Sequence, residues 1–128
     1  MEFQDKDLLQ VIGDFLEKGY ADSIAAMFRQ DSSLYRLTGE LVRDERFMVR
    51  MGVAVLFEEL VATRPDEVEG AIAFLVPLLA DTRPWVRGEA ANILGIIGTG
   101  KARAHMEQLL KDPDPQVREI AADFLTAD

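Results

Sequence analysis

The stretch LLADTRPWVRGEAANILGIIG, residues Leu78–Gly98, decides the fold because it contains a helix end, a polar turn and a second amphipathic helix. Its turn and the start of its second helix carry the phrase Asp-x4-Val-Arg, at Asp81–Arg87. The same phrase occurs at Asp44–Arg50 and again at Asp112–Arg118. Recurrence at separations of about one helical hairpin predicts copies of one unit stacked on one another.

Apolar residues along the whole chain recur every three or four positions, which is the period of an amphipathic helix and not of a strand. Proline, glycine and aspartate interrupt this pattern and mark helix ends. We therefore expect an all-α fold without strands, in which eight helices form about four antiparallel hairpins. Ser32 or Ser33 is expected to cap the third helix, and Pro77 to bend the fifth without dividing it. The predicted helices span residues 7–18, 21–30, 33–43, 46–63, 67–80, 84–97, 101–111 and 115–126.

The three copies of the phrase also agree in the helix that follows it. When they are aligned on the valine, the small residue Ala90 falls opposite Ala121, and Leu94 falls opposite Phe57 and Leu125. Small residues suit the places where two helices cross closely, and large ones fill the core of a hairpin. This agreement predicts an α-solenoid, in which each hairpin packs on its neighbours.

The copies extend into the stretches LVPLLADTRPWVRGEAANILGIIG, MEQLLKDPDPQVREIAADFL and, as a divergent first copy, LTGELVRDERFMVRMGVAVLFEEL. These stretches resemble HEAT repeats, in particular the short bacterial and archaeal type also found in phycobilisome lyase HEAT-like proteins. The resemblance covers about Leu34–Thr126, and it implies an α-solenoid of helix pairs that mainly binds other proteins. We expect a single domain, 1–128, with a capping hairpin at 1–31, a divergent repeat at 33–64 and further repeats at 66–98 and 101–127.

The charged residues of the phrase suggest a structural role. The aspartates lie in the turn between paired helices and the arginines one turn into the second helix, so successive repeats can interleave them as a ladder. The alternative is that they are solvent-facing charges of little energetic weight. Pairing stabilises the charged forms of both groups, which suits proton transfer poorly. The expected ladder residues are Asp44, Arg50, Asp81, Arg87, Asp112 and Arg118.

Two other features resemble ligand-binding sites, one for a nucleotide phosphate and one for a metal ion, but each lacks residues that such a site needs. The segment Gly95–Lys101 fits the phosphate-loop spacing G-x4-G-K, but Ala102 stands where serine or threonine must hold magnesium, and the loop leaves a helix instead of a strand. His105 is the only histidine and the chain has no cysteine, which leaves too few ligands for a zinc site. We therefore expect no catalytic, cofactor-binding or metal-binding residue, and a protein that is not an enzyme.

The second helices of the three repeats present residues that lie outside the core stripe. Exposed methionine and tryptophan side chains are costly in water and anchor many protein interfaces. This face changes from apolar in the first repeat to acidic in the third. The alternative is that the N-terminal hairpin covers Met48 and Met51, or that Trp85 packs on the adjoining repeat. The candidate partner-binding residues are Met48, Met51, Val55, Trp85, Glu89, Asn92, Ile96, Glu119 and Asp123.

Composition narrows the range of partners. The net charge is −9, and an acidic surface disfavours nucleic acids and anionic membranes. The absence of cysteine and of a basic-then-apolar N-terminus favours the cytoplasm. The expected function is a protein-binding scaffold whose second-helix surface holds a helix or peptide. A tetrapyrrole-binding maturation factor and, more remotely, a HEAT-like DNA-binding protein are the alternatives, and association of copies through the open ends of the solenoid stays open.

Overall fold

A computed structural model describes residues 4–126, which form helices joined by short turns, with no strand in that range. Short 3-10 segments continue several α-helices, so that the described residues form eight continuous helical segments. The predicted all-α fold is confirmed. The α-helices are α1 (Asp5–Glu17), α2 (Ala21–Gln30), α3 (Thr38–Val42), α4 (Phe47–Thr63), α5 (Pro65–Val68), α6 (Ile72–Leu75), α7 (Pro84–Ile97), α8 (Gly100–Met106) and α9 (Pro115–Thr126). The 3-10 segments are η1 (Ser32–Leu37), η2 (Glu69–Ala71), η3 (Val76–Ala80) and η4 (Glu107–Lys111).

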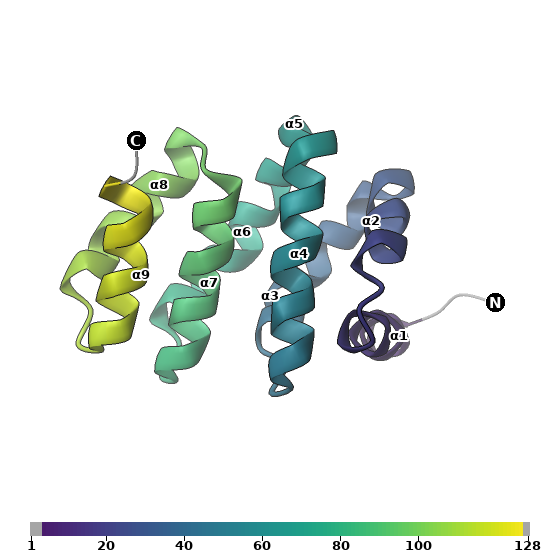
Figure 1. The fold of residues 1–128 in the computed structure, drawn as a ribbon, viewed down its shortest axis with the longest axis horizontal. Coiled ribbons are helices and arrows are strands. Elements are labelled where there is room, and N and C mark those ends of the chain that lie inside the picture. Colours follow the sequence, from purple (N-terminus) through teal and green to yellow (C-terminus); the bar gives the residue numbers. More distant parts are fainter. Residues whose placement is uncertain (1–3, 127–128) are drawn as a thin grey trace.

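The helices are arranged in two rows (Figure 1). In the front row α4, α7 and α9 run side by side, and α3, α6 and α8 lie behind them. Helix α1 is seen nearly end-on at the N-terminal end of the rows, so it lies across the direction of α4. Helix α7 contacts both α4 and α9, which gives the α-solenoid predicted from the repeats. We call the surface formed by α4, α7 and α9 the second-helix face.

The first helix of each repeat contains 3-10 turns, which the periodicity alone does not predict. Pro77 lies in η3 and has no N–H group to continue an α-helical ladder. Helical structure nevertheless passes through this residue without a break, from α6 into η3, as tighter turns. As expected, Pro77 does not divide the helix.

The cap of the third predicted helix is Asp31, so the prediction of Ser32 or Ser33 as the cap is wrong. The Asp31 carboxylate accepts hydrogen bonds from the backbone N–H of Ser33 at 3.0 Å and from the Ser33 hydroxyl at 2.6 Å. Helical structure begins one residue earlier than predicted, at Ser32. The residue before it is therefore the one whose side chain satisfies a free amide of the first turn.

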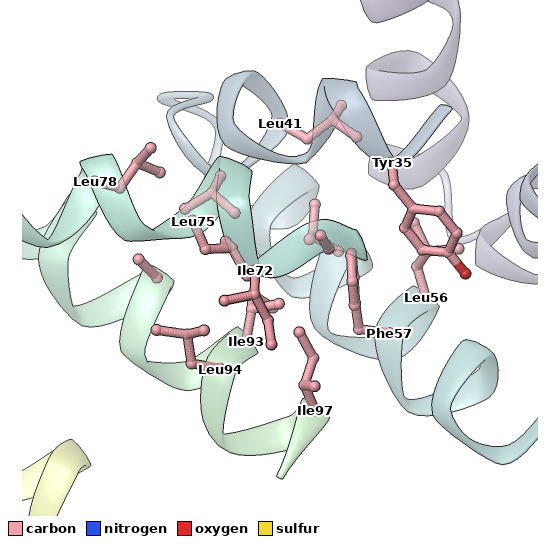
Figure 2. Packing of buried hydrophobic residues seen from close by; sticks show 14 of the residues in the cluster. Tyr35, Leu41, Leu56, Phe57, Ile72, Leu75, Leu78, Ile93, Leu94 and Ile97 are labelled. Atoms are coloured by element: carbon pink, nitrogen blue, oxygen red, sulfur yellow. The ribbon is translucent and has the colours of Figure 1, made fainter. Parts of the chain in front are cut away.

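The apolar core lies between the two rows of helices (Figure 2). The valines of the repeated phrase, Val49, Val86 and Val117, are buried, with at most 1% of their surface exposed. Phe57 and Leu94, which align in the sequence, are fully buried. Burying one such side chain contributes about 1.5–3 kcal/mol, so these repeated positions are a main source of stability.

Two glycines allow neighbouring helices to approach closely. A Cβ atom at Gly52 would lie 2.8 Å from the Cβ of Leu16, where α1 crosses α4. A Cβ atom at Gly95 would lie 2.3 Å from the ring of Phe124, where α7 meets α9. Neither distance leaves room for a methyl group unless a neighbour moves. These glycines therefore allow the close spacing of α1 against α4 and of α7 against α9.

Candidate functional site

The arginine of each repeated phrase binds the backbone of its own turn. In every copy its Nη1 atom donates to the carbonyl oxygen of the aspartate six positions earlier and to the carbonyl oxygen of the next residue. The turn leaves these carbonyls without the N–H, four residues further on, that a continuing helix would supply. The bonds to the aspartate carbonyls are Arg50 to Asp44 at 2.9 Å, Arg87 to Asp81 at 2.8 Å and Arg118 to Asp112 at 2.6 Å.

The aspartate side chains of the first two phrases bind a different arginine, two residues further on. Asp44 accepts from the backbone N–H, Nε and Nη2 of Arg46 at 2.9, 3.1 and 3.0 Å. Asp81 accepts from the same atoms of Arg83 at 2.9, 3.0 and 3.1 Å. Hydrogen bonds from Arg83 lower the pKa of Asp81 to about 2. Sequence reasoning missed both arginines, although the repeated Asp-x-Arg spacing was a signal for them.

The third phrase has Asp114 in place of that arginine, and its aspartate bonds to the preceding repeat instead. Arg87 donates to both carboxylate oxygens of Asp112, from Nε at 2.8 Å and from Nη2 at 2.9 Å. Only 13% of the Arg87 side chain and 5% of the Asp112 side chain are exposed. This contact joins two successive repeats and lowers the pKa of Asp112.

The first two repeats are joined by an aromatic contact and by a longer, single-contact ion pair. The guanidinium carbon of Arg50 lies 4.5 Å from the centre of the Trp85 ring, and that of Arg83 lies 5.2 Å from it. The Nε atom of Arg50 is buried without a hydrogen-bond partner in the described part of the chain, as expected for a guanidinium packed on a ring. Asp81 is reached from the preceding repeat by Arg43, at 3.6 Å.

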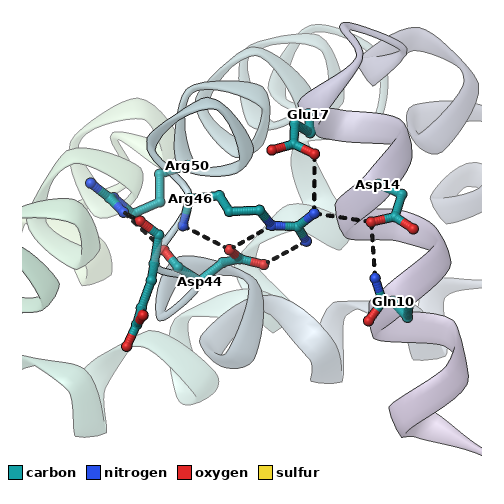
Figure 3. Close-up of polar contacts among 7 residues, drawn as sticks. Gln10, Asp14, Glu17, Asp44, Arg46 and Arg50 are labelled. Atoms are coloured by element: carbon teal, nitrogen blue, oxygen red, sulfur yellow. Dashed lines mark hydrogen bonds and ion pairs between the residues drawn. The ribbon is translucent and has the colours of Figure 1, made fainter.

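The polar contacts continue from the first phrase to α1 (Figure 3). Arg46 donates from Nη1 to Asp14 at 2.9 Å and to Glu17 at 3.2 Å, while it also binds Asp44. Gln10 donates to the same carboxylate oxygen of Asp14 at 3.0 Å. Arg46 thus fixes the N-terminal helix to the turn of the first repeat.

Helix α4 exposes four large apolar side chains on the second-helix face. The exposed fractions are 59% for Phe47, 52% for Met48, 47% for Met51 and 51% for Val55. We call these four residues the α4 apolar patch. Helices α1 and α2 leave the patch uncovered, although both pack against α4. The apolar spacing of the sequence predicts that Phe47 faces the core, and this prediction is wrong, because Phe47 stands at the first position of α4 and is exposed.

The predicted residues on α7 and α9 lie in different environments. Trp85 is half-buried, packs against the core and contacts Arg50 of the preceding repeat. Asn92 and Ile96 are half-buried further along α7. Glu119 and Asp123 are exposed on α9. The face is therefore apolar and exposed on α4, mixed on α7, and acidic and exposed on α9.

A groove lies between the starts of α7 and α9. It has a volume of about 310 Å³, and the residues around it include Trp85, Glu89, Gln116, Val117 and Ile120. Burial raises the pKa of Glu89, although the positive charge of Arg50 opposes this effect. Residues 4–126 hold no group of three or more histidine, cysteine, aspartate or glutamate side chains suited to a metal ion. In the same range no helix is long and apolar enough to cross a membrane.

Comparison with known protein families matches residues 58–126 to HEAT repeats, which is more than half of the 128-residue chain. The chain belongs to the HEAT-repeat family. HEAT repeats generally mediate contacts between proteins. The first phrase, Asp44–Arg50, lies before the matched residues, but its arginine makes the same turn contacts as the arginines of the other two phrases. No curated protein and no solved structure matches the chain.

Proposed function

We propose that this HEAT-repeat protein is a non-enzymatic scaffold that binds a helix or peptide of a partner protein on its second-helix face. The observation that carries this proposal is the α4 apolar patch, whose four members are each about half exposed or more. Contiguous apolar side chains on a surface favour association, because contact with a partner removes them from water. Methionine adds adaptable contacts, since its side chain is flexible and polarisable.

The second-helix face changes from apolar on α4 to acidic on α9, which favours a partner segment with both apolar and basic side chains. Apolar residues of the partner would cover the patch on α4, and basic residues would lie near Glu119 and Asp123 on α9, which are exposed. Complementary charge steers association and fixes orientation, whereas burial of apolar side chains contributes most of the affinity. The net charge of −9 favours a basic partner as well.

The test uses the double substitution Met48→Ser and Met51→Ser, which removes apolar surface and leaves the buried core unchanged. We expect the protein to keep its helical circular dichroism and thermal midpoint and to bind its partner at least about tenfold more weakly. Affinity capture from the source organism, followed by titration of the purified partner, measures both effects.

The matched control is Leu110→Ser, because Leu110 is 43% exposed but lies in the other row, in η4. This variant should bind the partner as the unaltered protein does. Equal partner binding by all three proteins would exclude the α4 apolar patch as the binding surface.

A further inference from the structure

We propose that the groove between α7 and α9 binds one cationic side chain, an arginine or lysine, of the partner protein. The inference rests on the proposed function, because it assigns a specific chemistry to the segment that docks on the second-helix face. It concerns a different element from the α4 apolar patch, so that the two can be tested separately.

The walls of the groove suit the stem of a long basic side chain. Trp85 lies on one side, on α7, and Val117 and Ile120 lie on the other, on α9. Arginine and lysine carry an apolar stem below their charged group, and such stems pack well along apolar surfaces. Glu89, one turn after Trp85, also lines the groove, where it can meet the charged end.

The carboxylate of Glu89 lacks a bonded cation. It is half-buried, and the hydrogen bonds and ion pairs found within residues 4–126 include none to its side chain. Two charged groups near the groove, Arg50 and Asp114, make other contacts. Arg50 donates to the carbonyl oxygens of its own turn and packs on Trp85, and Asp114 accepts from the first amides of α9.

Burial of a carboxylate that has no bonded cation carries a free-energy cost, which the charge of Arg50 offsets only in part, and the pKa of Glu89 is accordingly raised. A cation that enters the groove reduces this cost and gains a charge-assisted hydrogen bond. The groove therefore favours a positive group over a neutral one of the same shape.

The distance from the α4 apolar patch to the groove suits one short helix of the partner. Packed helices lie about 8–10 Å apart, so that a segment from α4 across α7 to α9 spans roughly 20 Å. At about 1.5 Å per residue, roughly 13 helical residues cover this distance. Apolar residues at one end would then meet the patch while a basic residue near the other end enters the groove.

The experiment uses synthetic amphipathic peptides of about 14 residues with a leucine-rich half and, in the other half, a single arginine or its neutral isostere citrulline. Trp85 is the only tryptophan of the chain, so its fluorescence reports directly on the groove. We expect the arginine peptide to change this fluorescence and to bind about tenfold more tightly than the citrulline peptide.

The variant Glu89→Gln should lose this preference for arginine, with both peptides bound alike. The control Glu69→Gln removes the same charge from an exposed residue of η2 and should keep the preference, which separates the groove from general attraction by an acidic protein. Equal binding of the arginine peptide by the Glu89→Gln and unaltered proteins overturns the inference, as does the absence of any fluorescence change. The double variant Met48→Ser, Met51→Ser separates this outcome from failure of the proposed function. If Glu89→Gln has no effect but the double variant binds the peptides more weakly, the proposed function stands without the groove. If that variant binds as tightly as the unaltered protein, the proposed function fails as well.

Discussion

At the scale of single residues, the repeated phrase uses its charges differently in each copy. The arginine of the phrase serves the turn carbonyls every time, whereas the aspartate takes whichever guanidinium is within reach. In the first two copies the aspartate binds the arginine two positions later, Arg46 or Arg83. The third copy has Asp114 at that position, and Asp112 binds Arg87 of the preceding repeat. The residue two positions after the aspartate thus decides whether the guanidinium that hydrogen-bonds the carboxylate comes from the same turn or from the preceding repeat.

The pair of Arg87 with Asp112 predicts a stability effect. In the variant Asp112→Asn the guanidinium remains buried without its carboxylate, so we expect the free energy of unfolding to fall by about 2–4 kcal/mol. Urea denaturation measures this change. The control is Asp5→Asn, because Asp5 binds Arg36 through a pair whose side chains are 56% and 36% exposed, and little change is expected there. Similar losses in both variants would mean that burial does not strengthen the Arg87 contact.

At the scale of helices, the order of the elements and the core could be predicted from the sequence, and several contacts between elements could not. Apolar spacing and the position of prolines and glycines fix the helices, and alignment of the repeats identifies buried residues such as Val86 and Leu94. The partner of Asp112 is Arg87 of the preceding repeat, at 2.8–2.9 Å, and spacing along the chain does not determine this contact. The exposure of the α4 apolar patch also depends on how α1 crosses α4, through the contact of Gly52 with Leu16.

The contact of α7 with α9 predicts a steric effect at Gly95. An added methyl group meets the ring of Phe124 at 2.3 Å, so Gly95→Ala should lower the free energy of unfolding by about 1–3 kcal/mol despite the better helix propensity of alanine. Chemical denaturation measures the loss. The matched variant is Gly70→Ala, where no atom lies within 4 Å of the added Cβ, and it should keep or slightly raise stability. A Gly95→Ala protein as stable as the unaltered one would show that α9 shifts without cost.

At the scale of the whole molecule, the aspartates of the three phrases make the fold sensitive to acid. The pKa values of Asp44, Asp81 and Asp112 all lie below the ordinary value of 3.8. A carboxyl group with a depressed pKa contributes stability above its unfolded-state pKa and loses it as the pH falls through the folded-state pKa. For Asp81 this window runs from about pH 4 down to about pH 2.

We therefore expect the urea midpoint to be nearly constant from pH 7 to about pH 5 and to fall steeply below about pH 4. The midpoint, followed by circular dichroism at each pH, measures the loss. Asp81→Asn should have a lower midpoint at neutral pH and a shallower decline in acid. Glu89 has a raised pKa, so its protonation in acid favours the folded state. This opposing effect comes from one group, whereas three aspartates act in the other direction. A midpoint independent of pH down to about pH 2 would contradict the role given to these carboxylates.

The two contacts between successive second helices, α4 with α7 and α7 with α9, differ in chemistry. This difference affects how cooperatively the solenoid unfolds. Helices α4 and α7 are joined partly by Arg50 packed on Trp85, whereas α7 is tied to the last repeat through the carboxylate of Asp112. In a linear array, total stability is the sum of the unit terms and the nearest-neighbour couplings. Protonation of Asp112 removes the bidentate contact at the second junction, whereas the packing of Arg50 on Trp85 at the first junction does not depend on a carboxylate. Acid strong enough to protonate Asp112, whose pKa lies below 3.8, therefore shortens the cooperative unit from its C-terminal side, so that α8, η4 and α9 open as a separate subunit of the fold before α1–α7 do.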